Sequence, residues 1–475
     1  MSGRWSVRRR GWSLITMAVA GALLAAAQPQ EPVRYSMLEG TRLLKISDVG
    51  VPEVTPLRGT FDLTRNPNED TFLVTYLRGF DEFGTERVTG NGTYVTDPAT
   101  WSQHMILDVL IDGESCHLDS GEVSNDAGFP MIDIAVTQVV TTPDEPYYVL
   151  RLLGVPALPV WFSTEMSFTR PSGAVVSDGD VLTSLGAVLW TNQQLTAQLG
   201  IMSPTPDIGL DALYPVEVDD RLPWWEAWFS SEVGAFSETL GPLSDGDLLS
   251  EGGFIVARNA ELLMHFMPEL PEDCGLDAIT WGWWCNGWYF STEVDFWSWK
   301  MMDMVSHGDL LCAQDGWVVF RNAELLANFE PLEPLPDLGL DAVYMWPSGH
   351  IWFSLEEGFH DARYGLISDG DVLCRNGWVI KRNRELVARF EPLEDVDNFG
   401  LDALHLAPVQ RGDMNGDGRI NAFDIDPFVI ALVDPEAYYA LYPELIRDVV
   451  GDINCDGVMN VFDIDPFVQL LTSGG

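Results

Sequence analysis

The sequence predicts a mainly β protein with three folded parts: an N-terminal antiparallel sandwich-like domain, a four-fold β repeat array and a small α-helical C-terminal module. Three observations lead to this prediction. Residues 32–156 alternate apolar and polar side chains between turn residues, residues 158–406 repeat one pattern four times, and residues 412–471 contain two acidic loops that each lead into one helical segment. Alternation with a period of two is typical of strands, and a fixed internal period marks a repeated structural unit.

Residues 1–27 have the pattern of a secretory signal peptide. Arg4 and Arg8 to Arg10 precede an apolar run, Leu14 to Ala27, which closes on three alanines. A basic start, a short apolar stretch and small residues at the cleavage point define such a signal. We therefore expect a secreted protein, extracellular or at the cell surface. We expect no membrane insertion, because no later run reaches the roughly 18 apolar residues that a spanning helix needs.

The charge balance limits the classes of partner. The chain has 72 acidic and 26 basic residues, a formal net charge of −46. A strongly negative surface repels phosphate backbones and anionic lipid headgroups. The composition thus argues against nucleic acid as a partner.

Residues 32–156 are expected to form a β-sandwich or an open barrel of seven or so antiparallel strands. Segments such as 71–77, 104–111 and 147–153 alternate apolar and polar residues, and Gly-Asn-Gly and Pro-Asp turns separate them. This pattern predicts a half-buried antiparallel sheet. We find no motif in this part that carries chemistry.

Residues 158–406 contain four units of about 62 residues. Gly-Leu-Asp-Ala begins at Gly209, Gly275, Gly339 and Gly400. Phe-Ser-x-Glu ends at Glu165, Glu232, Glu293 and Glu356, and a Gly-Asp-[Val/Leu]-Leu motif contributes Asp180, Asp247, Asp309 and Asp371. Four strands are expected in each unit, which predicts propeller blades; an elongated array of the same units is the alternative.

The recurring acids allow two interpretations. They could form a three-acid metal or catalytic cluster in each unit, or they could accept hydrogen bonds from turn amides and hold the unit together. We favour the second, because residues present in every unit usually maintain the unit. Asn192, Asn259, Asn322 and Asn383 are expected to be helix N-caps. The many tryptophans of the repeats, such as Trp284 and Trp288, suggest either packing between units or a glycan-binding face.

The C-terminal segment carries two twelve-residue loops with oxygen side chains at positions 1, 3, 5, 9 and 12 and glycine at position 6. Calcium prefers six to eight oxygen ligands, and such a loop supplies them from alternate positions and from the carbonyl at position 7. The expected ligands of two calcium ions are Asp413, Asn415, Asp417, the Arg419 carbonyl, Asn421 and Asp424 in the first loop, and Asp452, Asn454, Asp456, the Val458 carbonyl, Asn460 and Asp463 in the second.

These tandem loops, each followed by Phe-Asp-Ile-Asp-Pro-Phe, resemble a type I dockerin domain at the C-terminus of a secreted bacterial repeat protein. The resemblance covers residues 412–471 and implies two calcium-binding loop-helix units whose paired helices dock on a cohesin domain. The chain departs from that family at position 12, where the usual EF-hand has Glu and both loops have Asp. At positions 10 and 11 it has Ala-Phe and Val-Phe instead of small hydroxyl residues. We expect Phe423, Phe428, Phe462 and Phe467 to bury between the helices.

The first functional hypothesis is a secreted, non-catalytic calcium-binding protein. Its dockerin-like module would anchor it to a cohesin-like or other surface protein, while the β repeats act as a binding or structural platform. Glycans are one class of ligand that this platform could bind. The alternative is a dockerin-bearing carbohydrate-active protein that takes part in polysaccharide breakdown. We assign no catalytic residues, because the sequence has no nucleophile elbow, zinc-protease motif, phosphate loop or dinucleotide fingerprint. If the protein is an enzyme, a glycoside hydrolase is expected, since two carboxylates suffice for that chemistry.

Overall fold

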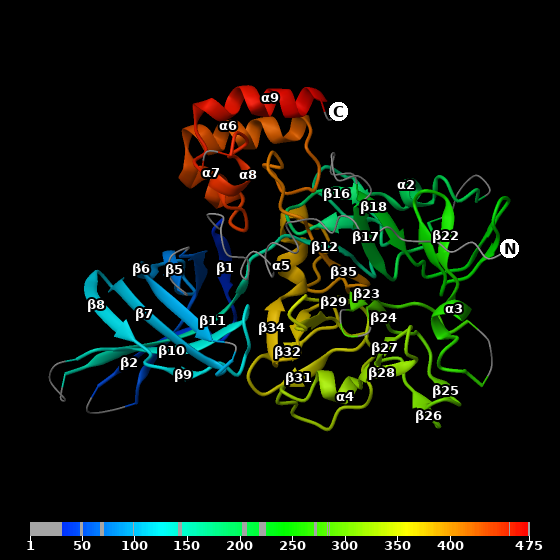
Figure 1. Cartoon of the computed structure of the whole chain (residues 1–475), viewed down its shortest axis with the longest axis horizontal. Helices are drawn as coiled ribbons and strands as arrows, with labels where there is room; N and C mark the ends of the chain where they lie inside the picture. The colour runs from blue at the N-terminus through cyan, green and yellow to red at the C-terminus, as the bar shows by residue number, and fades with distance from the viewer. Residues whose placement is uncertain are drawn as a thin grey trace.

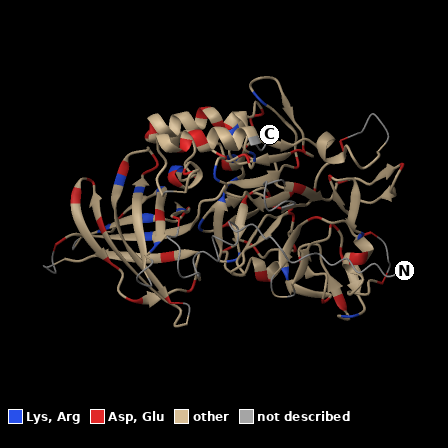
Figure 2. Cartoon of the chain, turned by 45° about the horizontal axis from the view of Figure 1, so that its top comes forward, with Lys and Arg blue, Asp and Glu red and all other residues tan. Residues whose placement is uncertain are grey.

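The computed structural model describes residues 31–47, 51–66, 71–97, 99–140, 145–201, 207–217, 225–269, 273–282, 284, 286–455 and 457–473. The predicted signal peptide and Asp456 lie outside these residues. The described chain is mainly β, as predicted, with an N-terminal β domain, a ring of four sheets and a helical module that lies across the top of both in Figure 1. No helix of the described residues is long and apolar enough to cross a membrane. Acidic side chains are spread over all three parts (Figure 2).

The N-terminal domain is one antiparallel sheet that closes on itself. β1 pairs with both β4 and β11, so the order β1-β4-β5-β6-β7-β8-β10-β11 returns to its start. Of the two expected forms, a sandwich and an open barrel, this sheet is closer to the barrel, because its strands form one continuous sheet instead of two packed face to face. The strands are β1 (Val33–Met37), β2 (Arg42–Ile46), β3 (Glu53–Pro56), β4 (Arg58–Arg65), β5 (Phe72–Phe80), β6 (Glu86–Asp97), β7 (Ser102–Ile111), β8 (Glu114–Asp119), β9 (Val123–Ser124), β10 (Ile132–Gln138) and β11 (Tyr147–Pro156).

The predicted alternation explains how this sheet encloses a core. Along β7, Met105, Leu107, Val109 and Ile111 are buried, while the residues between them are half-buried or exposed. Successive strand side chains point to opposite faces, so alternate positions fill the interior. On the opposite face, where the domain meets the C-terminal module, Arg34 Nε lies 2.8 Å from Asp62 Oδ1, and both side chains are buried.

The repeats form a four-bladed propeller-like ring, which confirms the propeller prediction over the elongated array. The blades are β35-β12-β15-β16, β17-β18-β21-β22, β23-β24-β27-β28 and β29-β30-β33-β34. Their strands are β12 (Val160–Ser163), β15 (Val181–Thr183), β16 (Val188–Trp190), β17 (Leu213–Glu217), β18 (Trp225–Phe229), β21 (Leu248–Ser250), β22 (Phe254–Ala257), β23 (Ile279–Gly282), β24 (Gly287–Phe290), β27 (Leu310–Cys312), β28 (Trp317–Phe320), β29 (Val343–Met345), β30 (Ile351–Phe353), β33 (Val372–Cys374), β34 (Trp378–Lys381) and β35 (Ala403–Leu406).

Each blade also carries a short hairpin and one short helix. The hairpins are β13 (Phe168–Thr169) with β14 (Val175–Val176), β19 (Ala235–Ser237) with β20 (Gly241–Leu243), β25 (Phe296–Ser298) with β26 (Asp303–Val305), and β31 (Phe359–Asp361) with β32 (Gly365–Ile367). The helices are α2 (Asn192–Thr196), α3 (Asn259–Leu263), α4 (Asn322–Leu325) and α5 (Asn383–Val387), the last followed by η1 (Ala388–Phe390).

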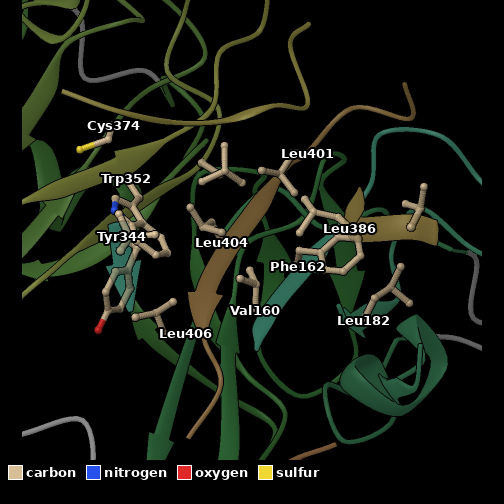
Figure 3. Close-up of a cluster of buried hydrophobic side chains, with 14 of the residues drawn as sticks. Val160, Phe162, Leu182, Tyr344, Trp352, Cys374, Leu386, Leu401, Leu404 and Leu406 are labelled. Atoms are coloured by element: carbon tan, nitrogen blue, oxygen red, sulfur yellow. The ribbon is translucent and has the colours of Figure 1, made fainter. Parts of the chain in front are cut away.

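The ring is closed by its last strand. β35 pairs antiparallel with β12, the first strand of the repeat region, in the register Val160 with Leu406 and Phe162 with Leu404. Figure 3 shows these four side chains on two adjacent strands. All four belong to one buried cluster, which also includes Leu153 and Val155 of the N-terminal domain. The first blade is therefore built from both ends of the repeat region.

The acids of the Gly-Asp-[Val/Leu]-Leu motif have the structural role that we favoured. In the fourth blade, Asp371 accepts hydrogen bonds from the amides of Ser368 (3.1 Å) and Asn383 (2.9 Å), and the other three units repeat this arrangement. The N-cap prediction is wrong by one residue, because Thr191, Arg258, Arg321 and Arg382 precede the helices. The asparagines start the helices, and their side-chain amides donate to the carbonyls of Gly209, Gly275, Gly339 and Gly400.

The N-terminal domain is joined to the fourth blade at His350. The ring Nε2 lies 2.8 Å from the Ala127 carbonyl and Nδ1 lies 2.8 Å from Ser348 Oγ. A carbonyl only accepts, so Nε2 carries the proton in this arrangement. Burial lowers the pKa of His350 below its ordinary value of 6.5.

This contact predicts a loss of stability on acidification. A histidine whose pKa is lower in the folded than in the unfolded protein contributes stability that is complete above about pH 6.5 and declines as the pH falls below that value. Thermal unfolding of the wild type and of His350→Gln between pH 7.5 and 5 measures this, and the difference between the two proteins should shrink as pH falls. His360→Gln, at an exposed position of the same blade, is the control. A difference that stays constant with pH would contradict the assignment.

The C-terminal module consists of η2 (Ala422–Asp424), α6 (Ile425–Val433), α7 (Pro435–Leu441), α8 (Arg447–Val450), η3 (Val461–Asp463) and α9 (Ile464–Ser473). α6 and α9 lie side by side at the top of the molecule (Figure 1) and pack through Phe428 and Phe467, whose rings are stacked with centroids 4.1 Å apart. Both rings are buried with Met414, Tyr438 and Met459 in a small core of their own.

Candidate metal centre

The first loop turns its carboxylates inward through backbone hydrogen bonds. Asp413 accepts from the amides of Asp417 (3.0 Å) and Gly418 (2.8 Å). Asp424 accepts from Met414 (2.7 Å), Asn415 (3.2 Å) and Asn421 (2.8 Å), so it ties the end of the loop to its beginning. Gly418 has φ +77°, a conformation that residues with a Cβ rarely adopt.

These acids are held in an environment that opposes their charge. Asp413, Asp417 and Asp424 are all buried. Burial, followed by the charges of Asp424 and Asp417, raises the pKa of Asp413 well above its ordinary value. Burial is also the main reason that the pKa of Asp424 rises to about 7. An isolated group of buried carboxylates is costly unless a cation or a proton neutralises it, and a hard, oxygen-only ligand set suits calcium.

The second loop repeats part of this arrangement. Asp463 accepts from the amides of Asn454 (3.0 Å) and Asn460 (2.8 Å), and Asp452 accepts from Gly457 (2.9 Å). Asp452 and Asp463 are buried. A difference from the first loop is Arg411, whose Nη1 lies 3.0 Å from Asp452 Oδ2. This loop therefore has a protein cation beside one predicted ligand.

The other predicted ligands either lie with the acids or make local backbone contacts. Asn415 lies with the acids, because its amide donates to Asp417 Oδ2 at 3.0 Å. Asn421 and Asn460 instead cap η2 and η3 through hydrogen bonds of 2.8 Å from the amides of Phe423 and Phe462. The Val458 carbonyl accepts from the Asn460 side chain at 2.9 Å. Arg419 follows Asp417, whose Oδ1 accepts the Arg419 amide at 2.9 Å.

The first loop packs directly on the propeller. A Cβ added at Gly416 would meet Leu185, and one at Gly418 would meet Trp161. The Arg419 guanidinium donates to the Leu189 carbonyl and lies 5.4 Å from the Trp190 ring centre. These contacts place the first loop against the first blade, whose inner strand β35 ends at Leu406, shortly before the module begins. By contrast, Cys455 and Val458 of the second loop are exposed.

Both loop-helix units of the module expose large apolar side chains. Phe428 and Phe467 are buried as expected, but the prediction for Phe423 and Phe462 is wrong, because these side chains are 77% and 73% exposed. A spacing of five residues turns a helical side chain by roughly 140°, so both phenylalanines of one unit cannot face the partner helix. The exposed apolar side chains of the two units, called the apolar face below, are Phe423, Ile425, Val429, Val433, Val461, Phe462, Ile464 and Val468.

The tryptophans of the repeats mostly pack against other aromatic rings. Trp288 lies 4.9 Å from Tyr214, 5.0 Å from Trp281 and 5.9 Å from Trp228, measured between ring centres. Trp284 is about half exposed and contacts Phe320 across 5.8 Å. Packing inside the propeller therefore explains why Trp288 and its aromatic neighbours are present, without a glycan ligand.

Comparison of the chain with family models, with curated proteins and with solved structures found no match.

Proposed function

We propose that this is a secreted, non-catalytic calcium-binding protein whose C-terminal module anchors it to a cohesin-like partner, extracellular or at the cell surface. The propeller and the N-terminal β domain are the platform that this module holds in place. The observation that carries the proposal is the pairing of two acidic loops with one exposed apolar face on the same small module.

Calcium gives the module its folded form in this proposal. Each loop gathers buried carboxylates whose mutual repulsion disfavours folding until a cation neutralises them. A module of about 60 residues has a small core, so metal binding supplies much of its folding free energy. The loops then fix the orientation of α6 and α9 and of the apolar residues on them.

The apolar face is the docking surface. Phe423, Ile425 and Val429 of the first unit correspond to Phe462, Ile464 and Val468 of the second, so the face has two-fold sequence symmetry. Exposed aromatic side chains next to aliphatic ones are typical of the energetic centre of an interface. The partner should therefore present an apolar surface to Phe423 and Phe462, in contrast to the hydrogen-bonding contacts that small hydroxyl residues would make.

The module contacts both parts of the platform. Arg34 of the N-terminal domain donates to the Pro443 carbonyl at 3.1 Å, and Lys381 of the fourth blade forms an ion pair with Glu444. Together with the contacts of Arg419, these interactions join the module to both other parts. Docking through the apolar face would thus fix the orientation of the whole molecule on the partner.

A binding measurement tests the proposal. Immobilised cohesin-like domains with an apolar docking surface should retain the full chain in calcium and release it in EDTA. Phe423→Ser and Phe462→Ser should each weaken binding about 30-fold, since loss of a central aromatic contact costs about 2 kcal/mol. Phe83→Ser, at an equally exposed phenylalanine of the N-terminal domain, should leave binding unchanged. Binding that is insensitive to EDTA, or equal effects of all three substitutions, would overturn the proposal.

A further inference from the structure

Four aspartates converge where the propeller blades meet. Each is the Asp of Gly-Leu-Asp-Ala and lies just before the inner strand of its blade, β17, β23, β29 or β35, and these strands contact one another around the ring. The residues are Asp211, Asp277, Asp341 and Asp402, whose exposed fractions are 8%, 7%, 4% and 5%.

These aspartates lack the hydrogen bonds that the other repeated acids make. In each of the four, Oδ2 is buried and has no hydrogen-bond partner among the described residues. The Gly-Asp-[Val/Leu]-Leu acids, by contrast, accept two backbone amides each. A buried carboxylate oxygen without a partner costs free energy, so its retention in all four blades requires a ligand or a proton.

The glutamates of Phe-Ser-x-Glu complete the cluster. A Cβ added at Gly209, Gly275, Gly339 or Gly400 would collide with Glu232, Glu293, Glu356 or Glu165, respectively, so each glutamate lies directly on the turn that carries the aspartate. All four glycines have φ between +69° and +74°, where a Cβ is strained. Ligand oxygens of Glu165, Asp341 and Asp402 lie within 4.8 Å of one another. We call the four aspartates and four glutamates the acid ring.

The blades are hydrogen-bonded to one another at the same level. Ser230 Oγ donates to the Leu276 carbonyl of the next blade at 2.7 Å, and Ser291 Oγ donates to Leu340 at 2.7 Å. Ser163 to Leu210 and Ser354 to Leu401 complete the circle. The donating serines belong to the Phe-Ser-x-Glu motifs, which also carry the glutamates. The accepting leucines belong to the Gly-Leu-Asp-Ala motifs, where each directly precedes its aspartate. The acid ring is thus held by contacts that run around all four blades.

The charge of the acid ring is unbalanced. The four aspartates are buried, and the four glutamates are exposed beside them. Among the described residues, no arginine or lysine forms an ion pair with any of the eight acids, and the basic group beside them is His307, near Glu356. A bound cation would replace the missing positive charge.

We propose that the acid ring binds one hard divalent cation, calcium, at the centre of the propeller. All the available side-chain donors are carboxylate oxygens. Glu165, Asp341 and Asp402, whose ligand oxygens lie within 4.8 Å of one another, can supply up to six oxygens if each carboxylate binds through both of its oxygens, which is within the range that calcium takes. Because its ligands come from different blades, the ion holds the ring together. This site is distinct from both loops and does not depend on the docking function.

Counting bound calcium tests the site in the full chain. After equilibrium dialysis at saturating calcium, metal analysis should give three ions per wild-type chain and two for Asp341→Asn/Asp402→Asn. The loop variant Asp424→Ala/Asp463→Ala should retain one ion. Glu82→Gln/Glu122→Gln, which removes the same charge from exposed positions of the N-terminal domain, should retain all three. The loop variant and the ring variant (Asp341→Asn/Asp402→Asn) are expected to lose different ions, so the loss of one site is not mistaken for the loss of the other.

Thermal unfolding gives the second readout. Asn is nearly isosteric with Asp and removes the repulsion, so in EDTA the ring variant should unfold at or above the wild-type temperature. In calcium the order should reverse, because the variant loses the ion. The proposal is overturned if the ring variant binds as many ions as the wild type, or if it is destabilised equally in EDTA and in calcium.

Discussion

Asp424→Ala/Asp463→Ala is expected to bind two calcium ions fewer than the wild type and to lose the ordered structure of residues 412–473. Asp424 and Asp463 are fully buried at position 12 of their loops. Alanine removes the predicted bidentate ligand and also leaves three amides of the first loop and two of the second without their acceptor. Each orphaned buried amide costs about 1–3 kcal/mol. Calcium analysis and hydrogen exchange over the module measure both effects.

The matched control lies two residues further along each unit. Asp426→Ala/Asp465→Ala removes the same charge from exposed positions in the first turns of α6 and α9. Its cost should be limited to the helix-dipole contribution, about 0.3–1 kcal/mol for each residue. A double variant at positions 424 and 463 that keeps the full calcium count would disprove the role of the loops. Asp424→Asn separates the two causes, since it keeps an oxygen for the amides and loses charge.

The four repeated units can be predicted from the sequence because their motifs recur at regular intervals, but these intervals alone do not distinguish a closed ring from an elongated array. The closure of the ring is indicated by the order of the two motifs Phe-Ser-x-Glu and Gly-Leu-Asp-Ala along the chain. The first Phe-Ser-x-Glu precedes the first Gly-Leu-Asp-Ala, and the last Gly-Leu-Asp-Ala follows the last Phe-Ser-x-Glu. The first blade thus lacks an inner strand until β35 supplies one. In the N-terminal domain, alternation is the same in a sandwich and in a closed sheet, and only the pairing of Tyr35 with Pro156 distinguishes them.

The two kinds of acidic site differ in how far sequence reasoning reaches. A calcium loop places its ligands within twelve residues, so its pattern can be recognised locally. The acid ring draws Glu165, Asp341 and Asp402 from distant positions, and in sequence these acids look the same as Asp371, which holds a turn. The distinguishing feature is the unpartnered oxygen, which depends on packing between blades and is visible only in three dimensions.

Arg34→Met is expected to destabilise the N-terminal domain by about 3–5 kcal/mol, because it leaves Asp62 buried without its partner. Arg34 Nε and Nη2 lie 2.8 and 3.0 Å from the two oxygens of Asp62, a bidentate ion pair inside the protein. Arg34→Met/Asp62→Leu removes both charges and should recover most of this loss, since a buried ion pair is often replaceable by apolar residues of similar volume. Denaturant unfolding of the wild type, both single variants and the double variant gives the coupling energy.

The same arginine also contacts the module, and this allows its two roles to be separated. Its Nη1 donates to the Pro443 carbonyl at 3.1 Å and its guanidinium lies 4.6 Å from the ring centre of Tyr439. The double variant should therefore regain the stability of the N-terminal domain while α7 and the segment after it remain more open to hydrogen exchange than in the wild type. If the double variant fully restores both the stability of the N-terminal domain and the exchange protection of α7, Arg34 contributes only its ion pair. Restoration of neither would mean that its contact with the module dominates, and that attachment of the module stabilises the domain beneath it.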